Sequence, residues 1–199
     1  MSVASKYNRI APFYEFIDLP LEFFFFHKWR KEVLSNLSGK VLEVGIGTGI
    51  NLKYYPPRSS VIGIDCSEKM LEKARKKASG MKNVTLFHMD AEHLEFPDRS
   101  FDYVVTTFVL CSVPDYVRAL QEIRRVLKLS GELIAIEYVR SSNHLISWFE
   151  DLISPITCSL IGDSMNRQTI EIIKEVGFTN MEVENLIFES FLRQIRAKP

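Results

Sequence analysis

Apolar and polar positions follow two different rhythms along this chain. Five short segments are apolar and rich in β-branched residues, as buried strands are, at residues 40–44, 60–64, 83–89, 101–107 and 132–139. Segments between some of them carry apolar residues at helical spacing on a charged background. Because strands that alternate with helices form parallel sheets covered on both faces, the pattern predicts an α/β fold.

Two of the intervening helices have recognisable ends. Ser67 is a suitable N-cap for a charged helix over residues 68–78, with Glu68 in its first turn. Pro114 stands where a second helix would begin, and Gly131 is predicted to end it. The buried stripe of this second helix is predicted to consist of Val117, Leu120, Ile123, Val126 and Leu127.

The last part of the chain changes rhythm. Residues 179–188 and 190–198 are adjacent strand-like runs, joined too closely for a helix to lie between them. They predict a hairpin, and therefore an antiparallel edge on an otherwise parallel sheet. We expect residues 36–199 to form this core, with an insert at about 140–170, and residues 1–35 to form a helical lid over it.

A glycine-rich turn after the first predicted strand points to a nucleoside pocket. Gly45, Gly47 and Gly49 are spaced two apart, directly after the carboxylate of Glu43. Glycines at such a turn let the backbone approach a ligand closely. Asp65 ends the second strand about 20 residues downstream, where an acidic side chain can meet ribose hydroxyls.

The spacing of these glycines disfavours two other nucleotide motifs. The dinucleotide pattern G-x-G-x-x-G would need glycine at position 50, where this chain has Ile50. No Gly-Lys-Ser/Thr follows the turn, so the phosphate-binding P-loop is also absent. A nucleotide-dependent oxidoreductase is therefore a less favoured alternative.

Composition narrows the functional classes. The 199 residues include 25 basic and 25 acidic side chains and no long basic block, which gives nucleic-acid binding little support. Three cysteines without C-x-x-C spacing argue for a reducing compartment and against a zinc site, so no metal is expected. With neither a signal-type start nor an apolar run of membrane-spanning length, a cytoplasmic protein is expected.

The order Glu43, Gly45, Gly47, Gly49 resembles the first motif of the class I S-adenosylmethionine (SAM) methyltransferases. Two further stretches agree with this resemblance, Asp90-Ala91 after the third strand and Arg125–Gly131, which is similar to the family's R-V-L-K-P-G-G. The resemblance implies a Rossmann-like methyltransferase sheet, SAM as cofactor and S-adenosylhomocysteine as product. The donor is expected to contact Glu43, Gly45, Gly47, Thr48, Gly49, Asp65, Cys66, Met70, Asp90, Ala91 and Phe108.

In this family the acid at Asp90 accepts a hydrogen bond from the adenine amino group, and the next backbone amide meets the ring. Asp65 would take the ribose. Phe108, just beyond the fourth strand, would form an apolar or cation–π wall for the sulfonium, or belong to ordinary core packing.

The N-terminal segment resembles the Y-x-x-x-A-x-x-Y opening of quinone and phospholipid-amine methyltransferases, with tyrosines at Tyr7 and Tyr14. There the segment folds over the donor. Residues 23–26 are four consecutive phenylalanines, more than one face of a helix can bury. They could line an acceptor tunnel, touch a membrane surface, form a dimer contact or pack as a lid.

The loop Leu110-Cys-Ser-Val113 and the 140–170 insert look like the methyltransferase group that includes thiol methyltransferases. Methyl transfer is an in-line displacement that needs a base only if the acceptor must lose a proton. Side chains that could serve on the acceptor side are Tyr7, Tyr14, Glu137, Tyr138, His144, Asp163 and Arg167.

These patterns predict a SAM-dependent methyltransferase of the type 11, quinone- and phospholipid-methyltransferase-like kind. Its acceptor would be small and apolar or amphipathic: a phospholipid amine, a quinone-like ring or a thiol. A non-catalytic module that binds SAM or a partner protein is the main alternative. The acceptor atom and the oligomeric state stay open.

Overall fold

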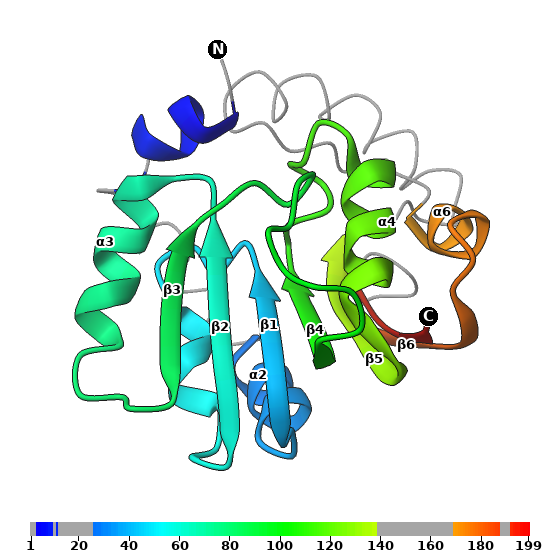
Figure 1. The fold of residues 1–199 in the computed structure, drawn as a ribbon, viewed down its shortest axis with the longest axis horizontal. Coiled ribbons are helices and arrows are strands. Elements are labelled where there is room, and N and C mark those ends of the chain that lie inside the picture. Colours follow the sequence, from blue (N-terminus) through cyan, green and yellow to red (C-terminus); the bar gives the residue numbers. More distant parts are fainter. Residues whose placement is uncertain (1–2, 10, 12–25, 139–168, 188–191) are drawn as a thin grey trace.

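The computed structural model describes residues 3–9, 11, 26–138, 169–187 and 192–199 (Figure 1). Its helical elements are a helix at residues 3–9, α2 (His27–Leu34), η2 (Ile50–Tyr54), α3 (Glu68–Lys77), α4 (Tyr116–Val126) and α6 (Thr169–Glu175). Its strands are β1 (Gly39–Val44), β2 (Ser59–Asp65), β3 (Val84–His88), β4 (Phe101–Thr107), β5 (Leu127–Tyr138), β6 (Thr179–Ile187) and β7 (Leu192–Lys198).

The strands form a single seven-stranded sheet of order β3-β2-β1-β4-β5-β7-β6. Strands β1 to β5 pair in parallel, and β7 pairs antiparallel with both β5 and β6. The predicted α/β class and the C-terminal hairpin are therefore confirmed. Because the chain leaves β1 toward β2 on one side and later returns to β4 on the other, the sheet has a switch point between β1 and β4. Ligands of open α/β sheets bind at the carboxyl ends of the strands there.

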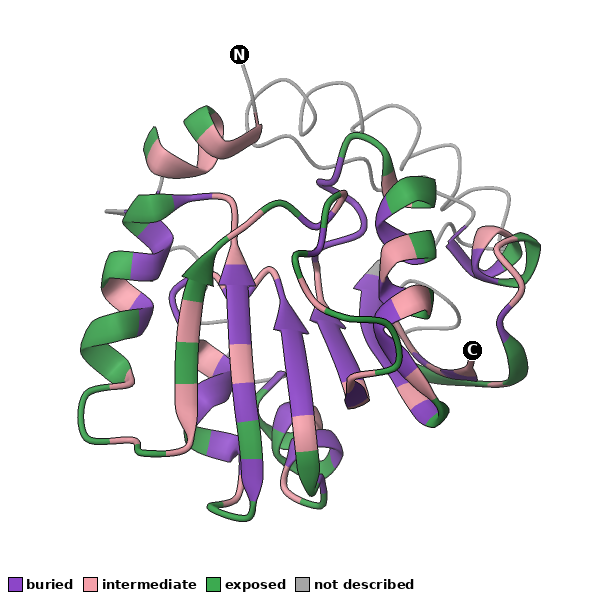
Figure 2. Cartoon of the chain, viewed as in Figure 1, coloured by how far each residue is buried: buried purple, intermediate pink, exposed green. Residues whose placement is uncertain are grey.

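Alternate residues of the strands face two separate cores. On β1, Leu42 and Val44 pack with α4 and α6, whereas Val41 packs with α2. The sheet is thus covered on both faces, and Figure 2 shows its central strands almost wholly buried while α3 and α4 expose their outer sides. Helix α2, which belongs to the predicted 1–35 segment, is part of the second core, and the division of the chain at residue 35 stays a prediction.

The second predicted helix differs from the structure at both ends. Helix α4 stops at Val126 rather than at Gly131, and β5 begins at once with Leu127. The helix does not continue for another turn, because the carbonyl oxygens of Arg125 and Val126 accept hydrogen bonds from the Arg99 and Ser100 amides instead. At the other end Val117, predicted to be buried, is 38% exposed, because Tyr116, Ala119 and Leu120 form the side of α4 that faces the core.

Gly131 has a different role from the predicted one. It lies where the pairing of β4 with β5 shifts register, between Phe101 opposite Leu127 and Tyr103 opposite Glu132. A Cβ atom at Gly131 would lie 2.9 Å from the Lys128 carbonyl oxygen and 3.1 Å from that of Asp102. The glycine therefore permits a close approach of three backbone segments.

The segment after the glycine turn forms only a short helical element. It is the five-residue 3₁₀ helix η2, which ends before Pro56 and Pro57. The residue before a proline avoids the helical region, so Tyr55 is extended, with ψ 129°, and the helix cannot continue. Among the described residues, no helix is both long and apolar enough to cross a membrane.

We expect Gly131→Ala to lower the free energy of unfolding by about 1–3 kcal/mol, since the new methyl group must displace backbone rather than a side chain. Urea unfolding followed by circular dichroism measures this, with the exposed neighbour Ser130→Ala as control. Equal unfolding midpoints for the two variants would contradict the assigned close approach.

Candidate functional site

The three glycines of the turn all have left-handed backbones, with φ values of 69°, 55° and 78° at Gly45, Gly47 and Gly49. Their surroundings differ. A Cβ atom at Gly45 would lie 2.4 Å from a methyl group of Val109, and one at Gly49 would lie 3.1 Å from the Ala74 backbone. A Cβ atom at Gly47 would meet nothing within 4 Å. Gly45 and Gly49 thus serve packing, whereas Gly47 presents its backbone to open space.

Asp65, at the carboxyl end of β2, holds this turn in place. One carboxylate oxygen accepts a hydrogen bond from the Gly47 amide, and the other accepts one from the Ser67 amide, both at 2.8 Å. Burial raises the pKa of Asp65, and the two amide hydrogen bonds oppose that rise. Each oxygen keeps a second acceptor position, so the carboxylate can also bind a ligand hydroxyl.

A pocket of about 310 Å³ lies at the carboxyl ends of the strands, next to this carboxylate. Eight of the residues predicted to bind the donor line it, namely Gly45, Gly47, Asp65, Cys66, Met70, Asp90, Ala91 and Phe108. Val3, Ala4 and Tyr7 of the N-terminal helix complete its wall. Its volume is at the lower end of the range of small-molecule sites, ~300–1,000 Å³.

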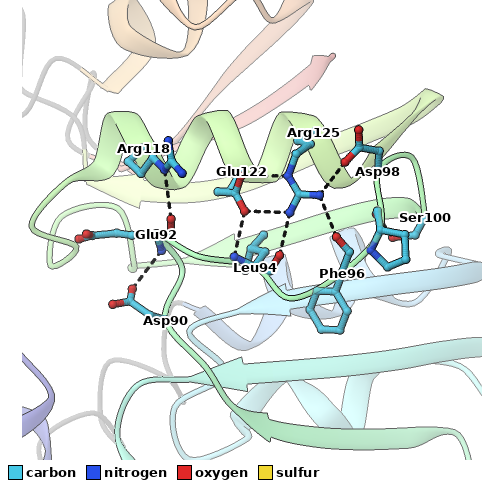
Figure 3. Close-up of polar contacts among 10 residues, drawn as sticks. Asp90, Glu92, Leu94, Phe96, Asp98, Ser100, Arg118, Glu122 and Arg125 are labelled. Atoms are coloured by element: carbon cyan, nitrogen blue, oxygen red, sulfur yellow. Dashed lines mark hydrogen bonds and ion pairs between the residues drawn. The ribbon is translucent and has the colours of Figure 1, made fainter.

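The loop that follows β3 forms another part of the pocket wall, and Figure 3 shows its polar contacts. Asp90 accepts a hydrogen bond from the Glu92 amide at 3.0 Å, which leaves its other oxygen for a ligand. Glu92 in turn accepts from the Asp115 amide at 2.9 Å, at the start of α4. The loop is therefore fixed to the start of α4 through Glu92, which itself lines the pocket.

Arg125 makes a second attachment of this loop to α4, which Figure 3 shows. Its guanidinium donates to both carboxylate oxygens of Glu122 and to the carbonyl oxygens of Leu94 and Phe96. Glu122 also accepts from the Leu94 amide at 3.0 Å. The hydrogen bond from Arg125 lowers the pKa of Glu122. Arg125 belonged to a recognised motif, but nothing in the sequence predicted that it holds the loop.

Phe108 lies on the opposite side of the pocket with an uncommon backbone. Its φ is 59°, and a bulky side chain rarely adopts that left-handed conformation. The ring is 5.0 Å from that of Phe26 and 5.5 Å from the Arg30 guanidinium carbon, both from the α2 side. Such strain persists only where the surroundings over-determine it. Phe108 therefore both lines the pocket and packs in the core, and its role as a wall for the sulfonium stays a prediction.

Glu137 supports the loop that carries Phe108. It is fully buried in β5, and one carboxylate oxygen accepts hydrogen bonds from the Val109 and Leu110 amides at 3.1 and 3.3 Å. The residue does not line the pocket. It was predicted as a base on the acceptor side, and its contacts instead favour a structural role.

Glu43, predicted to contact the donor, points away from the pocket. It is buried on the α2 side of β1, where one oxygen accepts from the Asn51 side-chain amide at 2.7 Å. Asn51 also donates to the Thr107 hydroxyl at 3.1 Å and accepts from Arg30 at 2.7 Å. Burial raises the pKa of Glu43 to about 7, against the opposing hydrogen bond from Asn51. No sequence pattern predicted Asn51, although its position two residues after Gly49 is compatible with a buried polar node.

The remaining predicted residues fall into three groups. Thr48 and Gly49 adjoin the turn without lining the pocket, and Thr48 accepts a hydrogen bond from Lys77 at 3.2 Å. Phe26 is buried, so that ring is not available to a membrane. Tyr14, residues 23–25, His144, Asp163 and Arg167 lie outside the described residues, and Tyr138 is described only by its backbone, as the last residue of β5.

The pocket offers no ionised thiol. Burial raises the pKa of Cys66 to about 12, so at neutral pH its sulfur is a protonated, apolar part of the wall. Over the ranges that the structure describes, no group of three or more His, Cys, Asp or Glu residues could hold a metal ion.

Comparison with known proteins agrees with this geometry. Residues 42–135 match the methyltransferase domain family, and the chain is 41% identical over 145 residues to a demethylmenaquinone methyltransferase of Staphylococcus aureus. That match covers 68% of this chain and 57% of the relative, so the chain spans little more than half the length of that protein.

Solved structures share the fold. A SAM-dependent methyltransferase of Thermotoga maritima, described as a possible histamine N-methyltransferase, has a TM-score of 0.77 at 24% identity, with 98% of both chains covered. A phosphoethanolamine N-methyltransferase of Haemonchus contortus in complex with SAM has a TM-score of 0.66 at 21% identity, covering 81% of this chain and 48% of that one.

A pocket at the switch point of a mostly parallel sheet is the usual ligand site of an open α/β protein. Residues 42–135 form a methyltransferase domain with the fold of the class I SAM-dependent methyltransferases, and SAM is its cofactor. The fit is visible in the pocket itself, where the open backbone of Gly47 and the spare acceptor positions of Asp65 and Asp90 suit an adenosine.

The glycines give a testable contrast. Gly47→Ala should keep the fold, at a cost of about 1–2 kcal/mol for a left-handed alanine, and should weaken SAM binding because its methyl group stands at the pocket. Gly45→Ala should unfold at a lower urea concentration than Gly47→Ala, because its methyl group also collides with Val109. Urea titration and calorimetric titration with SAM test both statements; a reversed order of stability would contradict them.

Glu43 gives a pH dependence of stability. Its pKa is about 7 in the folded protein and 4.5 ordinarily, so the unfolded chain releases this proton first as the pH rises. Between these two values the contribution of Glu43 to the free energy of unfolding should fall, by up to about 3 kcal/mol. Below the lower value that contribution does not change with pH.

Glu43→Gln should remove this contribution, because glutamine accepts the same hydrogen bond from Asn51 without titrating. Urea unfolding of the parent and the variant across the interval measures the difference between their pH slopes. Parallel slopes would show that Glu43 does not titrate with a raised pKa.

Proposed function

We propose that this protein transfers a methyl group from SAM to a small, apolar or amphipathic acceptor, such as a quinone-like ring, a phospholipid amine or a thiol. The observation that carries the proposal is the pocket at the switch point, which both Asp65 and Phe108 line. The Staphylococcus aureus relative is a demethylmenaquinone methyltransferase, which supports an acceptor of this kind.

The chain's own residues suggest how the donor is held. Asp65 would accept hydrogen bonds from the ribose hydroxyls, while Asp90 and the Ala91 amide would meet the adenine. The backbone at Gly45 and Gly47 permits close approach beside them. When bound, SAM supplies an electrophilic methyl group on a sulfonium. Phe108 and Tyr7 border the same pocket, and aromatic faces suit a cationic centre.

The carboxylates of the pocket wall are poorly suited to act as a general base. Among the described lining residues the carboxylates are Asp65, Asp90 and Glu92, and all three accept hydrogen bonds from backbone amides. We infer that the chain accelerates transfer mainly by aligning donor and acceptor and by excluding water. Tyr14, Tyr138, His144, Asp163 and Arg167 remain predictions for any acceptor that must lose a proton.

We infer that the acceptor meets the apolar part of the pocket wall. Val3, Ala4, Val109 and Val113 line it together with Tyr7, and none of these side chains carries a charge at neutral pH. Such a wall favours a ring or an alkyl chain over a strongly charged acceptor. Contact with a membrane surface through residues 23–26 stays a prediction, of which Phe26 is no longer a part.

Calorimetric titration with SAM, S-adenosylhomocysteine and NAD tests the donor. We expect heat with the first two only, and a binding loss of roughly 10–100-fold for Asp65→Ala, the equivalent of lost charge-assisted hydrogen bonds. Asp65→Asn, which keeps one acceptor oxygen, should lose less. A folded sample that gives no heat with SAM would overturn the proposal.

Transfer of a labelled methyl group to quinone-like phenols, amine-headgroup lipids and alkyl thiols tests the acceptor. Product with at least one of these classes is expected. SAM binding without transfer to any class would instead identify a non-catalytic SAM-binding module.

A further inference from the structure

Asn8 contacts the first turn of α3 from a distant part of the chain. Its side-chain oxygen accepts a hydrogen bond from the Ser67 hydroxyl at 2.7 Å and another from the Lys69 amide at 3.2 Å. The residue belongs to the helix at residues 3–9, which lies over the carboxyl ends of the strands in Figure 1. This helix therefore has a directional attachment to α3 in addition to its packing.

The attachment uses groups that every helix leaves unsatisfied. The first amides of a helix have no partner within it, and a capping side chain usually satisfies one of them. Ser67 is the N-cap of α3, and its oxygen accepts from the Met70 amide at 3.3 Å. Its hydroxyl hydrogen and the Lys69 amide remain, and Asn8 accepts both. The cap of α3 is thus shared between two segments that lie 59 residues apart.

The same serine also connects to the pocket. The Ser67 amide donates to Asp65, and the other oxygen of Asp65 accepts from Gly47. A continuous series of hydrogen bonds therefore runs from Asn8 through Ser67 and Asp65 to the glycine turn. At the near end of this series, the residue next to Asn8 is Tyr7, which lines the pocket.

We propose that Asn8 is a positioning residue, which fastens the helix at residues 3–9 over the pocket and so keeps Val3, Ala4 and Tyr7 in its wall. The part of this proposal that concerns the donor rests on the proposed function. Residues of this helix and Asp65 line the same pocket, so a bound molecule would contact both. We expect a firmly attached helix to hinder the release of that molecule. Loss of the attachment should therefore speed release more than it slows entry.

Asn8→Ala removes both hydrogen bonds and raises the intrinsic helix propensity of residues 3–9, so a looser helix could not be blamed on poorer helix formation. Arg9→Ala is the matched control, because Arg9 is the exposed neighbour on the same helix. Asn8→Asp should rescue, because a carboxylate accepts the same two bonds and is favoured at a helix N-terminus.

Hydrogen–deuterium exchange of residues 3–9 in the protein alone tests the attachment without any donor. We expect amide exchange to be about three- to tenfold faster in Asn8→Ala than in Arg9→Ala, and restored in Asn8→Asp. Exchange that is equal in Asn8→Ala and Arg9→Ala would overturn the proposal, whether or not the protein binds SAM.

Stopped-flow dissociation of S-adenosylhomocysteine tests the consequence for the pocket. The dissociation rate should rise by a similar factor in Asn8→Ala, with little change in the association rate or in the urea midpoint. If exchange responds but dissociation does not, Asn8 holds the helix without shaping the pocket, and the positioning role is overturned. If the parent protein binds neither SAM nor its product, the proposed function fails while the exchange result still decides the attachment.

Discussion

The bridge that Asp65 makes between two backbone amides is the interaction on which the site depends. The carboxylate joins the glycine turn after β1 to Ser67, the N-cap of α3. The loops that follow two adjacent strands therefore hold each other in place. Burial makes the carboxylate expensive to ionise, and the two amides offset that cost, so the same residue is at once a structural tie and a hydrogen-bond acceptor for a ligand.

A second polar centre, on the α2 face of the sheet, performs a related task for the other wall. Asn51 makes hydrogen bonds with Glu43, Thr107 and Arg30 together, and Arg30 lies against the ring of Phe108. Glu137 then secures the amides that follow Phe108. Buried polar groups of this kind are costly when any member is lost, so each ties its neighbours to one arrangement. These contacts fix Phe108 and the loop after β4, which form part of the pocket wall.

Much of this arrangement was predictable from the chain, because it depends on local patterns. The alternation of strand-like and helical segments predicted a mostly parallel sheet. The spacing from Gly45 to Asp65 predicted that both residues belong to one pocket. The errors have a common cause: they depend on contacts between distant segments. The end of α4 at Val126 follows from hydrogen bonds to Arg99 and Ser100, and the direction of Glu43 follows from Asn51 and Arg30 on another helix. The contacts of Asn8 and Arg125 likewise appear only once the chain is folded.

The left-handed backbone of Phe108 sets local stability against the shape of the pocket. Glycine at this position would relieve the backbone but would remove the ring that Phe26 and Arg30 hold in place. Substitutions selected only for a more robust protein would therefore tend to erode this wall. Phe108 should be left unchanged in any attempt to make this protein more heat-resistant. It is the first residue to vary in an attempt to change what the pocket binds.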